Sequence, residues 1–144
     1  MCEISVRELT HDEMPAVLPL VESWNSSVPP KELSERLPEM LQLGYRCIAA
    51  FADTEIVGIA GFWFGCRFWC GRYIDVDNVI VHETWRDKGI GNLLMAEIHG
   101  EAETHQCDVA VLDAYLDNIG AHRFYQRLGY EPLGYHFVKR MRQP

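Results

Sequence analysis

The segment between residues 79 and 91 combines basic side chains, two glycines and the expected start of a helix. Arg86 and Lys88 stand just before Gly89 and Gly91. Glycines let backbone N–H groups approach a ligand closely, and a helix N-terminus carries a partial positive charge. Together with the two basic side chains, these features predict an anion site that is best suited to a phosphate or pyrophosphate.

Two common classes of phosphate site do not fit this segment. A P-loop requires the pattern G-x-x-x-x-G-K-[ST], and the chain contains no Gly-Lys pair. A dinucleotide-binding turn requires G-x-G-x-x-G, whereas residues 89–94 end in leucine. Asp113 lies at about the right distance for a ribose contact. However, the expected strand ends several residues before Gly89, and too little chain follows for a doubly wound sheet.

Residues 86–91, Arg-Asp-Lys-Gly-Ile-Gly, resemble the [QR]-x-x-G-x-[GA] loop of the GNAT N-acetyltransferase superfamily. Residues 118–130, Asn-Ile-Gly-Ala-His-Arg-Phe-Tyr-Gln-Arg-Leu-Gly-Tyr, independently resemble that superfamily's N-x-x-A-x-x-[FL]-Y-x-x-x-G-[FY] segment. The resemblance covers nearly the whole chain and is most specific over residues 73–130. It implies transfer of an acetyl group from acetyl-CoA to a primary amine by direct attack on the thioester. The alternative function is a CoA-binding sensor or interaction module that keeps the fold without turnover.

The resemblance also implies which residues bind acetyl-CoA. Main-chain groups of Val79 and Val81 would pair with the pantetheine arm like an added strand, and N–H groups of residues 87–92 would hold the pyrophosphate. Asn118 would cap its helix and contact CoA, although capping alone is an equal alternative. The predicted cofactor-binding residues are Val79, Val81, Arg86, Asp87, Lys88, Gly89, Ile90, Gly91, Asn92, Asn118 and Tyr125.

Tyr125 matches the tyrosine that commonly protonates the departing CoA thiolate in this superfamily. The ordinary pKa of a phenol is about 10 and that of a thiol about 8.5, so the proton transfer is nearly matched. Tyr125 also lies on the apolar stripe of its expected helix, and simple packing is the alternative interpretation.

The tetrahedral intermediate of the transfer would be held by a main-chain N–H. A covalent relay through cysteine is a rival mechanism, but no cysteine adjoins the two motifs in the sequence.

A general base is expected because an ammonium group must lose a proton before its nitrogen can attack the thioester. Asp113 ends a strand five residues before Asn118, where several relatives place a catalytic Glu. Asp77 and Asp75 lie on the strand that leads into the cofactor loop, where other relatives place their base. We rank Asp113 first, then Asp77, then Asp75.

The aromatic segment 62–73 is either a wall of the acceptor site or core packing with one apolar turn.

The elements that must position these residues follow the order β-α-α-β-β-β-α-β-α-β. Hairpins come first and a strand–helix–strand crossover follows, which predicts an α/β mixed sheet with one parallel pair around the helix that begins at Gly89. This agrees with the GNAT-like acyl-CoA N-acyltransferase fold, a mostly antiparallel sheet with one splayed parallel pair, flanked by helices. In the predicted strand 73–81, Asp75, Asp77 and Val79 alternate with Ile74, Val76, Asn78 and Ile80, which suggests one polar and one apolar edge near its start. The predicted strands are 5–9, 45–52, 56–64, 73–81, 108–113 and a final strand or hairpin arm over 130–141; the predicted helices begin near Thr10, Pro30 (with a bend or interruption at Pro38), Gly89 and Asn118.

Composition limits the remaining possibilities. The 144 residues suffice for one domain, residues 1–144, and no run approaches ~20 apolar residues, so no membrane span is expected. A net charge of −8 argues against nucleic acid and fits a cationic acceptor, a small-molecule or peptide amine. Five cysteines and an N-terminus without signal-peptide features indicate a cytoplasmic protein. Cys66 and Cys70 lack a second ligand pair, so no metal site is expected. Either a monomer or a homodimer is expected.

Overall fold

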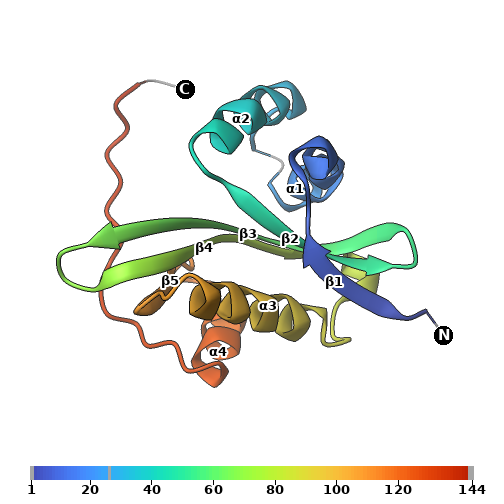
Figure 1. Cartoon of the computed structure of the whole chain (residues 1–144). Coiled ribbons are helices and arrows are strands. Elements are labelled where there is room, and N and C mark those ends of the chain that lie inside the picture. Colours follow the sequence, from blue (N-terminus) through green and yellow to red (C-terminus); the bar gives the residue numbers. More distant parts are fainter. Residues whose placement is uncertain (1, 26, 143–144) are drawn as a thin grey trace.

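A five-stranded sheet with the strands in sequence order forms the centre of the computed structural model, which describes residues 2–25 and 27–142 (Figure 1). Neighbouring strands are antiparallel from β1 to β4, whereas β5 runs parallel to β4. The predicted mixed sheet with one parallel pair is therefore confirmed. The strands are β1 (Ile4–Glu8), β2 (Arg46–Ala52), β3 (Glu55–Arg67), β4 (Gly71–Val81) and β5 (Val109–Leu112).

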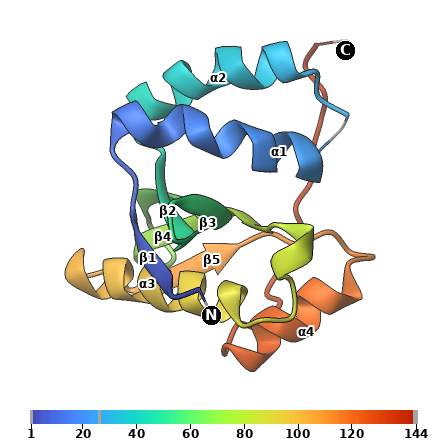
Figure 2. The ribbon, with the colours of Figure 1, turned by 90° about the vertical axis from the view of Figure 1, so that its right-hand side faces the viewer.

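Helices cover both faces of the sheet (Figure 2). A 3₁₀ helix (His11–Val17), α1 (Leu18–Trp24) and α2 (Pro30–Gln42) lie on one face, and α3 (Ile90–Thr104) and α4 (Ile119–Arg127) lie on the other. Alternation along β2 and β3 divides their side chains between two apolar clusters, one with Ile48 and Phe62 against α3 and one with Ala49 and Ile59 against α1. Each face of the sheet thus has its own core.

Two prolines act differently on the helices of the first face. The helix predicted to begin near Thr10 starts there, and the Glu13 carboxylate accepts a hydrogen bond from the Thr10 N–H at 2.9 Å. Pro15 falls inside the following turns, which are 3₁₀ rather than α-helical. Pro38 lies within α2, which continues to Gln42, so of the predicted bend or interruption the interruption is wrong. A proline removes one N–H donor from a helix, but α2 continues for four residues beyond it.

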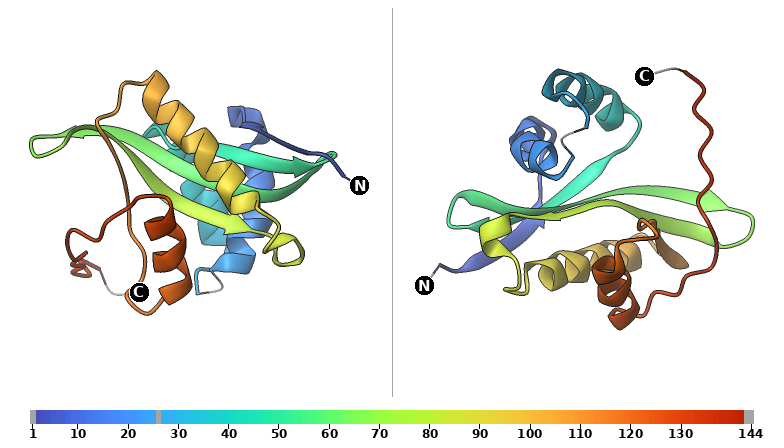
Figure 3. Two further views of the ribbon diagram at one scale, coloured as in Figure 1. Left: turned by 90° about the horizontal axis from the view of Figure 1, so that it is seen from below. Right: turned by 180° about the vertical axis from the view of Figure 1, so that it is seen from behind.

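The segment after α4 departs from the sequence prediction. Residues 130–140 form no strand (Figure 3). Every side chain from Glu131 to Arg142 is exposed. The predicted final strand over 130–141 is therefore wrong for this chain on its own. A strand requires a ladder partner, and none among the described residues pairs with this segment although its side chains keep a strand-like alternation.

No helix among residues 2–25 and 27–142 is long and apolar enough to cross a membrane.

Candidate active site

The parallel ladder between β4 and β5 is short, and its end defines the candidate site. Four residue pairs join the strands, and the last is Val76 with Leu112. Asp77 and Asp113 are consequently the first residues beyond the ladder on their two strands. From Asp77 to Val81, β4 has no partner on its β5 side among the described residues. This free edge includes Val79 and Val81, the residues predicted to pair with pantetheine.

A β-bulge at Asp77 changes which way the side chains of β4 point. Asn78 pairs with Gly61 and Val76 pairs with Phe62, so no residue of β3 lies opposite Asp77. Val76 packs in the α3 core and Ile80 packs in the α1 core. The extra residue places Asp77 and Asn78 together on the α1 face, so the alternation seen at the start of the strand does not continue beyond Asp77.

A small cavity of about 170 Å³ adjoins these two polar side chains. Apolar residues of α1 and α2, including Val21, Leu37 and Met40, form most of its wall, and Tyr45 contributes a polar edge. The Tyr45 hydroxyl donates to Asn78 Oδ1 at 3.0 Å. Burial strongly raises the pKa of Tyr45, so this hydroxyl remains protonated and able to donate. The cavity thus offers an apolar channel with polar groups at one end.

The three carboxylates predicted as base candidates come together around the end of the β4–β5 ladder. Asp77 is exposed and accepts a hydrogen bond of 2.9 Å from Trp63 Nε1. Asp113 is exposed and its Oδ2 lies 3.0 Å from His136 Nδ1. Asp75 is half-buried, and burial, followed by the charges of Asp113 and Asp77, raises its pKa. The cluster suits a positively charged partner.

The predicted anion loop has an unusual backbone. Asp87 and Gly89 both have positive φ, 60° and 80°, and α3 begins at the next residue, Ile90. Residues with positive φ in a turn point neighbouring backbone N–H groups into one concavity, and such a concavity binds anions. Gly89 also has no side chain to cap the helix, so the first N–H groups of α3 lack an intrahelical partner. A Cβ on Gly89 would meet nothing within 4 Å, so the space beside it is open.

The second glycine of the loop has a different role. A Cβ on Gly91 would lie 3.2 Å from the ring of Phe124 on α4. Gly91 therefore allows α3 and α4 to approach closely, whereas Gly89 supplies the turn. Of the two basic residues, Lys88 lies over the Trp85 ring at 5.1 Å and Arg86 donates to the Val81 carbonyl at 3.4 Å.

Residues of the second motif lie on α4, beside the start of α3. Asn118 caps α4, its Oδ1 accepting from the N–H of Ala121 at 3.1 Å. Tyr125 is half-buried and packs edge-on against Phe124 and Tyr130, with centroid distances of 5.1 and 5.8 Å. Its hydroxyl makes no hydrogen bond to another described residue, and burial raises its pKa. Tyr125 therefore packs and also carries an available proton.

The aromatic segment 62–73 divides into three parts. Phe62 is fully buried in the α3 core, and Phe68 and Trp69 are exposed at the β3–β4 turn. Trp63 alone adjoins the candidate site, and its ring contacts that of Tyr45 at 5.2 Å. Sequence reasoning included Trp63 only within the segment 62–73, as one of two alternatives, and did not assign Tyr45, Asn78 or His136 to the site. The adjacent polar pair Asp77–Asn78, inside an otherwise alternating strand, was the one available signal of the bulge.

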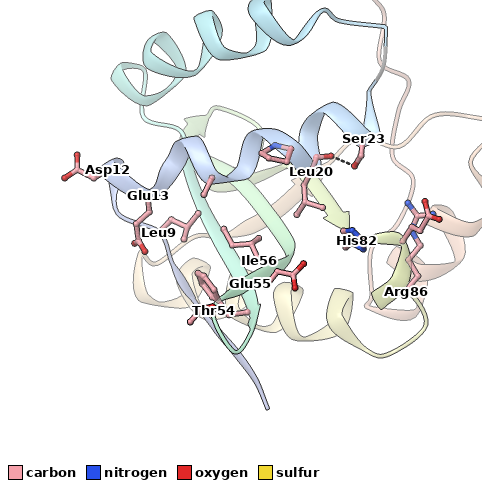
Figure 4. A pocket seen from close by; sticks show the side chains of 14 residues that line it. Leu9, Asp12, Glu13, Leu20, Ser23, Thr54, Glu55, Ile56, His82 and Arg86 are labelled. Atoms are coloured by element: carbon pink, nitrogen blue, oxygen red, sulfur yellow. Dashed lines mark hydrogen bonds between the residues drawn. The ribbon is translucent and has the colours of Figure 1, made fainter. Parts of the chain in front are cut away.

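A larger cavity of about 720 Å³ lies elsewhere, between the 3₁₀ helix, α1 and the β2–β3 turn (Figure 4). It reaches His82 and Arg86 at one end, while Asp75, Asp77 and Asp113 do not line it. It is therefore not the cavity that adjoins the carboxylate cluster. No group of three or more His, Cys, Asp or Glu side chains in the described part of the chain is arranged to hold a metal ion.

Comparison with known proteins identifies relatives of this arrangement. The model of the acetyltransferase (GNAT) family matches residues 5–130. The spermine/spermidine N(1)-acetyltransferase of Bacillus subtilis (strain 168) is 25% identical over 139 residues, which cover 89% of this chain and 88% of that protein.

Solved structures share the fold at lower identity. A structure of aminoglycoside N-acetyltransferase AAC(6')-Iy in complex with CoA superposes with a TM-score of 0.84 at 18% identity, covering 99% of this chain and 97% of that one. Ribosomal-protein-alanine N-acetyltransferase from Brucella melitensis biovar Abortus 2308 superposes with a TM-score of 0.80 at 22% identity, covering 96% and 99%.

Proposed function

The chain belongs to the acetyltransferase (GNAT) family and is an N-acetyltransferase, and we propose that it transfers the acetyl group of acetyl-CoA to a primary amine of a small aliphatic polyamine. One observation carries this proposal. The Asp77 carboxylate, held by Trp63, lies where the β4–β5 ladder ends and lines the small cavity between α1 and α2. It is thus positioned to receive an amine on one side of the sheet while a thioester arrives along β4.

The residues that would hold acetyl-CoA fit that molecule's parts. The pyrophosphate would be bound by N–H groups of residues 87–92, where the positive φ of Asp87 and Gly89 creates an anion-binding concavity. Arg86 and Lys88 add positive potential. The free edge of β4 at Val79 and Val81 would pair with the amides of pantetheine, as an added strand does.

The proposed reaction is a direct transfer. Asp77, directly or through a water molecule, takes a proton from the ammonium, and the amine nitrogen attacks the thioester carbonyl carbon. A C–N bond forms, and main-chain N–H groups of β4 near the bulge stabilise the oxyanion of the tetrahedral intermediate. The nitrogen loses its remaining extra proton to water as the C–S bond breaks, and Tyr125 donates its proton to the departing thiolate. We favour Asp77 over Asp113 as the base because Asp113 is engaged by His136, whereas Asp77 adjoins the cavity.

The nature of the cavity supports an aliphatic polyamine as acceptor. Its apolar wall matches a methylene chain, and Asp77 lines it. The charges of Asp77 and Asp113 act on Asp75, so the three carboxylates form a cluster that matches several ammonium groups. The net charge of −8 favours approach of such a cation. The Bacillus relative is itself named for spermine and spermidine.

Two further features belong to the proposal. Residues 1–144 would act as one domain, and the protein would be located in the reducing cytoplasm. The cytoplasmic location is supported by the cysteines, all of which are free thiols: Cys2, Cys47, Cys66, Cys70 and Cys107.

A single experiment tests turnover against the alternative of a CoA-binding sensor. Release of the CoA thiol is measured with spermidine, an aminoglycoside, glucosamine 6-phosphate and an alanine-terminated peptide, while calorimetry measures acetyl-CoA binding separately. The proposal predicts binding and turnover, with the highest kcat/KM for spermidine. Binding without turnover on any amine would favour the sensor, and turnover highest on another amine would reject the polyamine assignment alone.

A further inference from the structure

A single buried tyrosine contacts two groups at the end of the β4–β5 ladder. Tyr45, which is 3% exposed, packs against the Trp63 ring at 5.2 Å, and Trp63 in turn holds Asp77. The Tyr45 hydroxyl also donates to Asn78 Oδ1 at 3.0 Å. Tyr45, Asp77 and Asn78 all line the cavity of about 170 Å³. One phenol therefore positions both polar residues of β4 that line this cavity.

A glycine on β3 makes room for the phenol. Gly61 lies opposite Asn78, at the position next to the bulge. A Cβ on Gly61 would overlap the hydroxyl oxygen of Tyr45. Any larger residue at position 61 would therefore push the ring away, and the glycine keeps the hydroxyl within reach of the Asn78 amide.

The bond from Tyr45 determines which way the Asn78 amide is turned. The Tyr45 hydroxyl remains protonated and donates, so Oδ1 of Asn78 faces it. Nδ2 is then the free end of the amide, and it donates to no other described residue. Within that part of the chain no buried side-chain nitrogen lacks a partner, so Nδ2 is accessible to a ligand or to solvent. Asn78 thus offers two N–H donors next to the Asp77 carboxylate.

Only one of the two reacting groups can accept a hydrogen bond from these donors. An ammonium group of the amine carries donors alone and is repelled by another N–H. The acetyl carbonyl oxygen is an acceptor, and it becomes negatively charged in the tetrahedral intermediate. Asn78 lies between Asp77, the proposed base, and Val79, which is proposed to pair with pantetheine. The thioester is therefore expected to reach β4 beside Asn78.

From these observations we propose that Asn78 Nδ2 donates a hydrogen bond to the acetyl oxygen of acetyl-CoA and to the oxyanion that this oxygen becomes, with Tyr45 as the residue that positions the amide. The inference rests on the acetyl transfer proposed above and adds a side-chain donor to the main-chain N–H groups of β4. Asp77 takes the proton of the amine, and Asn78 stabilises the charge that develops on the thioester oxygen. The bulge makes both residues available because it places two consecutive side chains of β4 on the α1 face.

The test compares the binding of acetyl-CoA with that of CoA, which lacks the acetyl oxygen. Calorimetry on the full chain measures both dissociation constants, and thiol release with spermidine measures kcat. In Asn78→Ala the ratio of acetyl-CoA affinity to CoA affinity should fall about 3–10-fold, the usual value of one hydrogen bond. The loss in kcat should be larger, about 10²–10³-fold, because the oxygen becomes charged during the reaction. Asn78→Asp keeps an acceptor for Tyr45 and removes both donors, so its ratio should fall at least as far.

Tyr45→Phe tests the positioning role. This change keeps a ring against Trp63 and deletes the hydroxyl that orients the amide, so the affinity ratio should fall and kcat should decrease by roughly 10-fold. A purely structural role would lower the melting temperature and weaken both ligands equally, which leaves the ratio unchanged. Asn25→Ala is the matched control for Asn78→Ala, because Asn25 lines the same cavity where α1 ends and should not change the ratio.

An unchanged affinity ratio in two folded Asn78 variants would overturn the proposal, and so would an equal fall of the ratio in Asn25→Ala. A higher KM for spermidine with an unchanged ratio would assign Asn78 to the amine and reject its contact with the acetyl oxygen. Wild-type protein that binds acetyl-CoA but acetylates no amine would reject the transfer proposed above. The affinity ratio would still decide whether Asn78 contacts the acetyl oxygen, because it is measured without turnover.

Discussion

Trp63 Nε1 donates a 2.9 Å hydrogen bond to Asp77 Oδ2 and thereby joins β3 to the bulge of β4. The indole ring is held in turn by Tyr45, at a centroid distance of 5.2 Å. This hydrogen bond restricts the orientation of the Asp77 side chain. The Trp63–Asp77 pair therefore orients a charged group at the point where the β4–β5 ladder ends, which is the requirement for a base that faces a bound amine.

Asp77→Asn should lower kcat/KM for the amine by about 10²–10⁴-fold, the usual contribution of a general base. The amide keeps the shape and removes the charge, so acetyl-CoA affinity should change little. Part of the lost rate should return at alkaline pH, where free amine accumulates. Initial rates between pH 6 and 10 and calorimetry with acetyl-CoA provide the measurement. Full activity in Asp77→Asn together with loss in Asp113→Asn would transfer the base role to Asp113.

Trp63→Phe tests the orientation of the Asp77 carboxylate separately from its charge. This change keeps an aromatic ring against Tyr45 and deletes the N–H that holds Asp77. We expect a decrease in kcat of roughly 10-fold, smaller than that for Asp77→Asn, because the base remains but is less well positioned. Phe64→Leu provides a control on the same strand, since Phe64 packs on the opposite side against His105. An equal loss of rate in the control would assign the effect to the strand rather than to the hydrogen bond.

Tyr125→Phe tests protonation of the leaving group. The hydroxyl of Tyr125 has no described partner, so its removal should leave the melting temperature nearly unchanged and lower kcat by about 10²-fold or more. Tyr130→Phe is the matched control, because the Tyr130 hydroxyl bonds His99 Nε2 at 2.8 Å. That variant should lose stability and retain kcat. The reverse pattern would make Tyr125 a packing residue.

Gly89 allows the charge of the anion loop to be tested at constant shape. Gly89→Asn and Gly89→Asp add side chains of nearly equal size into open space, and Asn tolerates the positive φ found there. If the loop binds pyrophosphate, Gly89→Asp should weaken CoA binding at least 10-fold more than Gly89→Asn, since it adds a negative charge beside the phosphates. Equal affinities in two folded variants, measured by calorimetry, would remove the loop from the CoA site.

Local patterns predicted most of the architecture and part of the site. The glycines and basic residues of 86–91 and the N-cap at Asn118 are features of short segments, and sequence reveals such features directly. The Trp63–Asp77 bond could not be predicted, because it depends on a bulge that shifts the register of β4 against β3 by one residue. Residues 130–141 show the opposite case: their pattern is that of a strand, but pairing requires an edge that no local pattern specifies.

Asp75 gives the last prediction, which concerns stability rather than rate. Burial and the charges of Asp113 and Asp77 raise the pKa of Asp75 above its ordinary value of 3.8. A carboxyl whose folded pKa is raised favours the folded state when protonated, and this advantage is lost as pH rises through the folded pKa. At pH 7 the ionised Asp75 is therefore a cost, so Asp75→Asn should raise the melting temperature. The gain should shrink as pH falls toward 4, because the wild-type carboxyl becomes protonated. Melting curves from pH 4 to 8 measure this, with the exposed Asp117→Asn as a control that shows no such trend. A lower melting temperature for Asp75→Asn at neutral pH would mean that the carboxylate forms a stabilising contact in the folded protein.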